Sequence, residues 1–296
     1  MYYKLFFLLT IVTAIFLLCS DTTAREGFED LAKEKFRSLS GPAVYDHSYA
    51  GMYDGIFVRK QRISHEFNKL FQYTDLSKQT WVLDVGCGTG HLIGRLHKDE
   101  IPCVGMDRSE AMLERAKENY PGAKFVLGDA TQPSHNYFGK FDVITCMYFT
   151  YYEMKNKEQF LRNCLNWLKP GGKLYLHLAD SAKIDPILPV GNVLINIDPQ
   201  DYSEKKITTT RAVFENKQYK SDFQNRGGDN YALVETVVDR RSGHVKRLER
   251  ELLMPPVKHS VAMAQALGFT SEGGTEMVDC GYGGQYIYVF RKTNSV

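Results

Sequence analysis

The most constraining feature of this 296-residue sequence is an apolar run that ends in closely spaced glycines, Val82-Leu83-Asp84-Val85-Gly86-Cys87-Gly88-Thr89-Gly90. A strand that leads through such a turn into a helix presents backbone N–H groups to a ligand at the carboxyl end of the strand. Glycine suits the turn because it has no Cβ to obstruct tight backbone geometry. The spacing G-x-G-x-G differs from the dinucleotide fingerprint G-x-G-x-x-G. The segment therefore predicts a nucleotide-type site.

Strand and helix patterns alternate around this turn. Helical patterns cover residues 55–73, 91–98, 109–119 and 155–168. Strand-like runs cover residues 81–85, 101–106, 124–127, 141–147 and 173–178. Strands separated by helices indicate a parallel, doubly wound sheet with helices on both faces. The sequence therefore predicts an α/β, Rossmann-like fold.

The pattern changes after the fifth strand. Residues 207–224 and 231–253 alternate with period two, which predicts an antiparallel β meander inserted within residues 180–254. A helix is expected over 255–267, and residues 269–279 and 285–291 are expected to form a closing antiparallel pair.

The charge balance and the cysteines exclude several classes of function. Lys and Arg total 37 against 35 Asp and Glu, so no strong basic field indicates a nucleic-acid partner. The 43% of hydrophobic residues is ordinary for a globular protein and unlike a polytopic membrane protein. The six cysteines show no CxxC or Cys/His spacing, so no metal site is predicted.

The N-terminus contains an uncharged apolar run, Leu5–Cys19. It is somewhat short for the ~30 Å hydrocarbon core, and Thr22-Thr23-Ala24 would suit signal cleavage, so anchor and cleaved signal both remain open. We expect a membrane segment over 1–20 and a polar tether over 21–42, with a helical stretch at 28–39 as an option. Basic residues after the run favour a single-pass anchor with a cytosolic catalytic domain; the alternative is the secretory pathway after cleavage.

Two further carboxylates follow the next strands. Asp107 ends the second strand, ~20 residues after the glycine turn, where a carboxylate binds ribose hydroxyls. Asp129 follows the third strand and is placed to meet an adenine amino group. Each aspartate by itself is more simply a helix-capping loop residue, but together with the turn they indicate one site.

These motifs resemble the class I S-adenosylmethionine-dependent methyltransferases over residues 44–291. The resemblance implies a methyltransferase domain over 43–296 and a seven-stranded sheet with a reversed last strand. It implies S-adenosyl-L-methionine as cofactor, with Arg108 and Met112 beside the adenine and a small packing residue at Cys87. The full set of implied cofactor-binding residues is Asp84, Gly86, Cys87, Gly88, Asp107, Arg108, Met112, Asp129, Ala130 and Met147.

The layout is similar to that of small-molecule members, and the amino-sugar N,N-dimethyltransferases fit best. Tyr45-Asp46, Tyr53 and the meander carry this similarity. No Asn-Pro-Pro-Tyr follows the fourth strand, which argues against methylation of adenine, cytosine or glutamine amino groups. We expect a small-molecule acceptor with an amine or hydroxyl. A protein, RNA or lipid methyltransferase and a cofactor-binding module without transfer remain alternatives.

Methyl transfer is an in-line displacement in which holding donor and acceptor together supplies most of the acceleration. The candidate catalytic residues on the acceptor side are His177, Tyr45 and Tyr152. His177 ranks first because strand carboxyl ends face the crevice, although a structural, hydrogen-bonded histidine is at least as good an interpretation.

Overall fold

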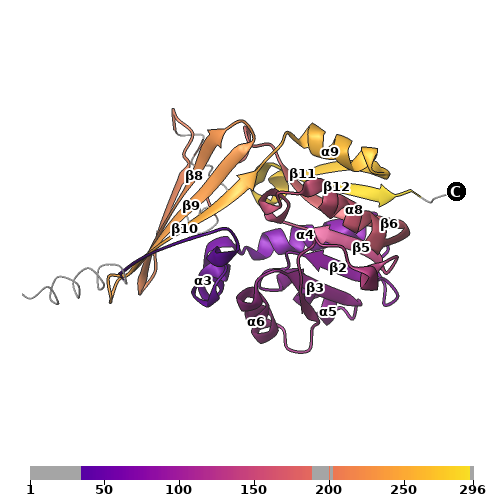
Figure 1. Cartoon of the computed structure of the whole chain (residues 1–296), viewed down its shortest axis with the longest axis horizontal. Helices are drawn as coiled ribbons and strands as arrows, with labels where there is room; N and C mark the ends of the chain where they lie inside the picture. The colour runs from indigo at the N-terminus through magenta and orange to yellow at the C-terminus, as the bar shows by residue number, and fades with distance from the viewer. Residues whose placement is uncertain (1–34, 189–199, 201–202, 294–296) are drawn as a thin grey trace, which may run out of the picture.

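The computed structural model describes residues 35–188, 200 and 203–293, which fold around two β-sheets (Figure 1). The strands of the larger sheet are β2 (Val82–Val85), β3 (Cys103–Asp107), β4 (Phe125–Leu127), β5 (Phe141–Cys146), β6 (Leu168–Ala179), β11 (Phe269–Met277) and β12 (Tyr282–Lys292). They lie in the order β11-β12-β6-β5-β2-β3-β4. Strand β12 runs antiparallel to its neighbours β6 and β11, and the pairs from β6 to β4 are parallel. The predicted seven-stranded sheet with its reversed last strand is confirmed.

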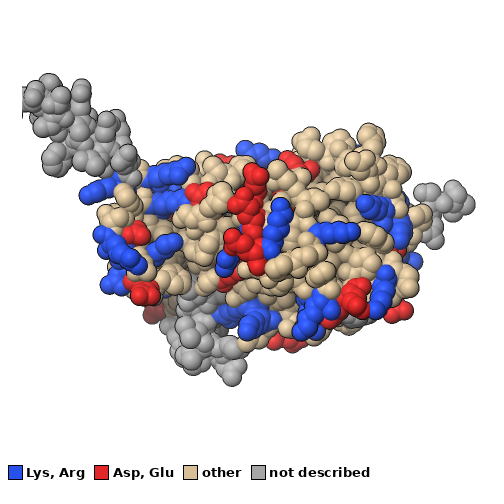
Figure 2. Space-filling view, turned by 90° about the horizontal axis from the view of Figure 1, so that it is seen from below, with Lys and Arg blue, Asp and Glu red and all other residues tan. Residues whose placement is uncertain are grey.

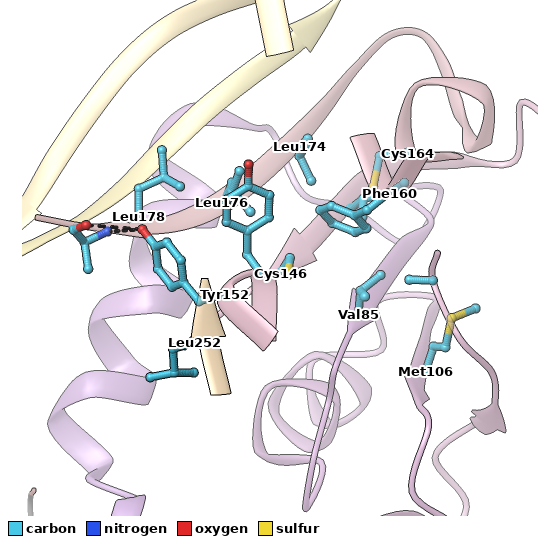
Figure 3. Packing of buried hydrophobic residues seen from close by; sticks show 14 of the residues in the cluster. Val85, Met106, Cys146, Tyr152, Phe160, Cys164, Leu174, Leu176, Leu178 and Leu252 are labelled. Carbon is cyan, nitrogen blue, oxygen red and sulfur yellow. Dashed lines mark hydrogen bonds between the residues drawn. The ribbon is translucent and has the colours of Figure 1, made fainter. Parts of the chain in front are cut away.

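Helices cover both faces of this sheet. They are α4 (Lys60–Tyr73), α5 (His91–Lys98), α6 (Glu110–Asn119), α8 (Lys157–Trp167) and α9 (Val257–Ala266). Alternate strand residues point to opposite faces, so Leu83 and Val85 join the hydrophobic cluster of α8 and α9, whereas Val82 joins that of α4 and α5. Figure 3 shows the α8 side of this packing, with Phe160 and Cys164 facing the strands. The two-layered covering fixes the carboxyl ends of β2, β3 and β5 at one edge.

The smaller sheet contains β1 (Phe36–Ser40), β7 (Thr209–Val213), β8 (Lys217–Gly227), β9 (Asn230–Asp239) and β10 (Val245–Leu253). Its order is β1-β10-β9-β8-β7, and β1 is parallel to β10 while the other pairs are antiparallel. One face, which carries Tyr219, Leu233 and Leu248, joins the hydrophobic cluster of α8. Two further helices complete the described fold: α3 (His47–Phe57), which packs against α6, and the single turn α7 (Thr150–Glu153), which packs against β10.

Two sequence-based expectations differ from the structure near the N-terminus. The expected helix over 55–73 is two helices, because Val58 and Arg59 have extended ψ angles of 125° and 130° between α3 and α4. Residues 36–40 of the expected tether form strand β1, which also excludes helix at the end of the stretch 28–39. A polar, exposed segment can be an edge strand because β10 satisfies its backbone hydrogen bonds.

The membrane segment predicted over 1–20 and residues 21–34 of the tether lie outside the described residues. In the described ranges, no helix is both long and apolar enough to cross a bilayer. The predicted insertion over 180–254 contributes β7 to β10 from Thr209 onward, but the sheet that they form also includes β1 from the N-terminal side. The meander is thus part of a larger unit than the sequence indicated.

Candidate functional site

The glycine turn after β2 is held against the next strand. The N–H groups of Gly86 and Cys87 both donate to the carbonyl of Met106, at 2.8 and 3.0 Å. Gly86 has φ +69°, a region that favours glycine, and a Cβ there would stand 2.5 Å from Oγ1 of Thr150. The turn therefore needs glycine both for its backbone and for the close approach of α7.

Asp107 links the turn to the loop after β3. Its Oδ2 accepts from the N–H of Gly88 and its Oδ1 from the N–H of Ser109, both at 2.9 Å. Burial raises the pKa of the Asp107 carboxyl, and the two N–H groups act in the opposite direction. Each oxygen keeps a lone pair for another donor, as a ribose-binding carboxylate requires.

Asp84 lies beneath the turn in the body of β2. It is buried and accepts from the Thr145 hydroxyl at 2.6 Å, and burial raises its pKa to about 7. Cys87 is also buried, and burial raises its thiol pKa well above the ordinary value, as expected for the packing residue that the sequence indicates. The turn thus carries a shielded carboxyl and an unreactive thiol.

The other predicted cofactor residues have varied surroundings. Met112 is buried, and its Cε lies 3.5 Å from where a Cβ on Gly88 would stand. Arg108 donates to Glu153 at 2.7 Å. Asp129 is exposed and accepts from the N–H and hydroxyl of Thr131 at 2.8 and 2.7 Å, so its carboxylate closes its own loop. The last two predicted residues, Ala130 and Met147, are both buried.

A cavity of ≈ 740 Å³, counting the space open to solvent, lies between the two sheets. Thr150 lines the cavity and packs against Gly86, so the glycine turn lies directly behind this part of the wall. Most of the wall is aromatic or aliphatic, and its charged side chains are Arg62, Glu153, Asp185 and Arg250. The aromatic side chains are Tyr45, Tyr53, Phe57, Tyr148, Phe149, Phe223 and Tyr282.

Of the three predicted catalytic residues, the structure places only Tyr45 in this wall. His177 is fully buried, with Nδ1 hydrogen bonded to the Tyr148 carbonyl and Nε2 to Gln285 at 3.0 Å. Burial lowers its pKa to about 3, so the ring is neutral. The Tyr152 hydroxyl accepts from the N–H of Ala179 at 2.6 Å (Figure 3). His177 and Tyr152 therefore lie outside the cavity and contact residues of its wall, His177 through Tyr148 and Gln285 and Tyr152 through Phe149.

Tyr45 belongs to a buried polar network that crosses the cavity wall. Its hydroxyl donates to Oε1 of Glu153, and Arg250 Nη1 lies 3.3 Å from the same hydroxyl. Arg250 Nε donates to Oε2 of Glu235 at 3.1 Å, and Glu235 also accepts from Tyr49. Burial, followed by Glu153, raises the Tyr45 pKa well above its usual value, so Tyr45 is a hydrogen-bond donor here.

Arg62 is a cavity residue that the sequence reasoning missed. It is 1% exposed, and its Nε donates to Glu66 at 2.8 Å one helical turn away. Its guanidinium lies 3.2 Å from the Tyr148 ring centroid. Its Nη2 is buried without a hydrogen-bond partner among the residues that the structure describes. The i, i+4 spacing of Arg62 and Glu66 was visible in the sequence, but it is equally typical of an exposed helix face.

Comparison with known proteins agrees with this geometry. Residues 82–172 match the family described as a methyltransferase domain. A curated relative from Saccharopolyspora spinosa, the dTDP-4-amino-2,3,4,6-tetradeoxy-D-glucose N,N-dimethyltransferase, is 32% identical over 136 residues. That match covers 44% of this chain and 54% of the relative, so the chain spans about half the length of the curated relatives that it matches first.

Solved structures extend the likeness to most of the chain. The CcbJ methyltransferase from Streptomyces caelestis has a TM-score of 0.64 at 16% identity, covering 84% of this chain and 98% of its own. The SAM-bound amino pentose methyltransferase CalS10 from Micromonospora echinaspora has a TM-score of 0.58 at 20% identity, covering 83% and 97%. At these identities the likeness shows the fold. The chain therefore has the Rossmann-like fold of class I S-adenosylmethionine-dependent methyltransferases, with a methyltransferase domain match over residues 82–172.

Proposed function

We propose that this protein transfers a methyl group from S-adenosylmethionine to an amine or hydroxyl of a small molecule. The observation that carries the proposal is that the glycine turn and a cavity lie on either side of Thr150, and that the cavity reaches the polar network of Tyr45, Glu153 and Arg250. The turn and Asp107 offer backbone and carboxylate groups suited to a nucleoside, and the cavity has room for a second reactant. This arrangement is what a two-substrate transfer requires.

The residues fit the cofactor part by part. Asp107 would accept the ribose hydroxyls, and Met112 would pack against the adenine near Gly88. The amino-acid end carries a carboxylate, which suits the unpartnered Nη2 of Arg62. When bound, the cofactor supplies a methyl group on a positively charged sulfur. Asp84, beneath the turn, adds negative charge on this side when it is ionised.

The aromatic wall would position the acceptor and exclude water. Tyr45 donates to Glu153, and Arg108 holds the other Glu153 oxygen at 2.7 Å, which fixes this carboxylate in the wall. An acceptor amine that reaches the wall would meet Glu153 as a hydrogen-bond acceptor and as the destination of a proton. His177 keeps Tyr148 and Gln285 in place through its two ring nitrogens.

We favour a small amine as the acceptor. The curated relative from Saccharopolyspora spinosa is named for dimethylation of an amino sugar, and the wall combines aromatic rings with a carboxylate, a setting that suits a cationic or sugar-like group. A hydroxyl acceptor is the second candidate. A protein, RNA or lipid acceptor is the remaining alternative.

Ligand binding and transfer test the proposal separately. S-adenosylhomocysteine at about 100 times its Kd should stabilise the full chain by about 2.7 kcal/mol, which is several degrees in Tm, and NAD should not. Labelled S-adenosylmethionine with matched panels of small amines and hydroxyl compounds then reads transfer. Stabilisation by NAD alone would overturn the proposal, and binding without transfer to any panel member would identify a binding module.

The apolar run Leu5–Cys19 enters the proposal as a membrane anchor or cleaved signal. An anchored chain would keep its full mass and stay with membranes after carbonate extraction, whereas cleavage after Ala24 would leave Arg25 as the new N-terminus. Mass spectrometry of the protein from its expressing cells distinguishes the two. Full-length protein that carbonate releases would contradict both.

A further inference from the structure

One end of the smaller sheet carries an exposed apolar row. The row consists of directly paired residues from all five strands: the apolar Phe36, Val245, Val238 and Val213, with the polar Gln218 between the last two. Paired residues share a face of the sheet, and this face is opposite to the one that Leu248 and Glu235 turn into the buried interior. Phe36 and Val213, on the two edge strands, are 53% and 71% exposed, and Val245 and Val238 between them are half-buried. Apolar groups that lie together at an open sheet end indicate a contact surface.

A basic row runs beside the apolar one. Two positions along each strand, the same face carries the exposed residues Arg247, Lys220 and Arg211. More basic residues stand at this end, namely Lys35, Arg37, Lys217, Arg240 and Arg241. The acidic residues in the turns there are Glu215 and Asp239. Figure 2 shows Lys and Arg side chains at this end, on the left, and also elsewhere on the visible face. The whole chain has a net charge of only +2, so positive charge is concentrated at this end.

One row farther in, the same face carries carboxylates. Glu249 accepts from Arg226 at 2.9 Å and lies 3.5 Å from Arg247, and Asp222 accepts from Gln224 at 2.8 Å and from Thr208 at 2.9 Å. The character of this face therefore changes from row to row: the outermost row is mainly apolar, the next carries cations, and the third carries carboxylates with hydrogen-bond partners. This order matches the layers of a bilayer surface, in which acyl boundary, anionic headgroups and water follow one another.

We propose that this end of the smaller sheet, which we call the sheet tip, binds the surface of an anionic lipid bilayer. The exposed side chains of Phe36 and Val213 enter the headgroup boundary, and Arg211, Lys220 and Arg247 face the lipid phosphates. An apolar row at the leading edge suits a lipid surface better than a nucleic acid, whose backbone offers it no apolar partner.

The sequence before β1 adds an independent argument. The uncharged run Leu5–Cys19 is followed by residues 20–35, which span at most about 55 Å when fully extended. Because β1 begins at Phe36, the chain joins the fold at the sheet tip and not at the far edge of the larger sheet. A membrane-bound segment would therefore bring this end to the bilayer. The inference does not depend on methyl transfer.

Vesicle binding by the full chain tests the sheet tip. The fraction of protein bound to vesicles of phosphatidylcholine alone includes any insertion of the N-terminal run. The additional fraction bound when phosphatidylserine is added measures the electrostatic contribution. We expect phosphatidylserine to raise the bound fraction in co-sedimentation. In the variant Phe36→Trp, emission should shift to the blue with phosphatidylserine vesicles. The triple variant R211E/K220E/R247E should lose at least about tenfold of the phosphatidylserine-dependent partitioning.

A matched control separates the sheet tip from net charge. The triple variant K98E/K117E/K124E reverses the charge of three exposed lysines around the larger sheet and has the same net charge as R211E/K220E/R247E. It should keep the phosphatidylserine-dependent binding. Equal losses in both triple variants, no phosphatidylserine effect, or unshifted F36W emission on bound protein would each overturn the proposal. So would a duplex DNA that displaces the protein from vesicles through the same three residues. Unchanged Tm in each variant confirms that the fold is intact.

Discussion

The glycine turn and the region around Arg250 hold their carboxylates by different means. At the glycine turn, Asp84 accepts from a hydroxyl and Asp107 from two backbone N–H groups, and in the described part of the chain neither forms an ion pair with Lys or Arg. Around Arg250, Glu235 of β9 is bound to Arg250 itself, and Glu153 of α7 is bound to Arg108. The first arrangement leaves the two carboxyl groups without a cation from the protein, and the second balances its charge internally. This contrast suggests that the glycine turn binds the cofactor and that the region around Arg250 positions the acceptor.

Glu235→Gln should give the largest effect, because it leaves the Arg250 guanidinium buried and poorly compensated. Glu235 is fully buried and accepts from Arg250, Tyr49 and Tyr219. Breaking such a pair costs about 3–5 kcal/mol in the free energy of unfolding, measurable by urea denaturation.

The control for this variant is Glu251→Gln. Glu251 lies 3.6 Å from Lys155, and both side chains are exposed. Its loss should change stability by no more than about 0.5 kcal/mol. Similar costs for the two variants would show that the Arg250 network does not stabilise the smaller sheet.

The second test concerns the carboxylate without a cation. Asp84 has a pKa of about 7 in the fold because of burial, against an ordinary 3.8. Between these values the folded state binds more protons than the unfolded state, so the free energy of unfolding falls as pH rises from about 4 to 7. Asp84→Asn should remove this fall and be more stable than wild type at pH 8, on the order of 3 kcal/mol, and equal to it near pH 4.

Denaturation of both proteins across this pH range measures the difference. A difference between Asp84→Asn and wild type that does not change with pH would mean that Asp84 is ionised throughout. In that case the protein would stabilise the ionised Asp84 carboxylate as it stabilises Glu235, and the two regions would not differ in how they hold their carboxylates.

The larger sheet was predictable because its signals are local. Each strand is a short apolar run, the glycine turn follows β2 directly, and Ser109 caps α6 by accepting from the N–H of Met112. The closing antiparallel pair was visible as two strand-like runs after the last helix, and the seven-stranded sheet with its reversed last strand was implied by the resemblance to class I methyltransferases. Local sequence is sufficient where each element carries its own start and stop signals.

The smaller sheet and the cavity wall were not fully predictable because they depend on distant partners. Strand β1 is polar and forms only against β10, some 200 residues away. His177 was expected to face the crevice, but its ring is bound by Tyr148 and by Gln285 of β12. Arg62 looks like a solvated helix residue until Tyr148 and Tyr282 enclose it. Burial of a polar residue is a property of the tertiary fold.

The third test compares Asp107 and Asp129, two aspartates at the same edge of the larger sheet, in the binding of the cofactor. Asp107 binds the turn itself, whereas Asp129 binds only its own loop. Asp107→Ala should weaken binding of S-adenosylhomocysteine by about a hundredfold, or roughly 3 kcal/mol, because two charged hydrogen bonds to the ribose are lost. Asp129→Ala should weaken it by no more than about tenfold.

Isothermal titration of both variants measures these affinities. Asp107→Asn, which keeps one acceptor oxygen, should lie between the Asp107→Ala variant and wild type. If Asp129→Ala proved the more damaging change, the adenine edge and not the ribose would carry the binding energy, and the loop of Asp129 would have to open on binding.

Arg62 offers the finest test, because its expected effect depends on one part of the ligand. Its unpartnered Nη2 should bind the carboxylate at the amino-acid end, so Arg62→Met should weaken S-adenosylhomocysteine by about ten- to thirtyfold. 5′-Methylthioadenosine lacks that carboxylate and should bind the variant and wild type equally. The ratio of the two affinities cancels any general damage to the site. An unchanged ratio would mean that the ligand carboxylate binds elsewhere. Arg62 would then be, like Arg250, a cation whose charge is balanced within the protein.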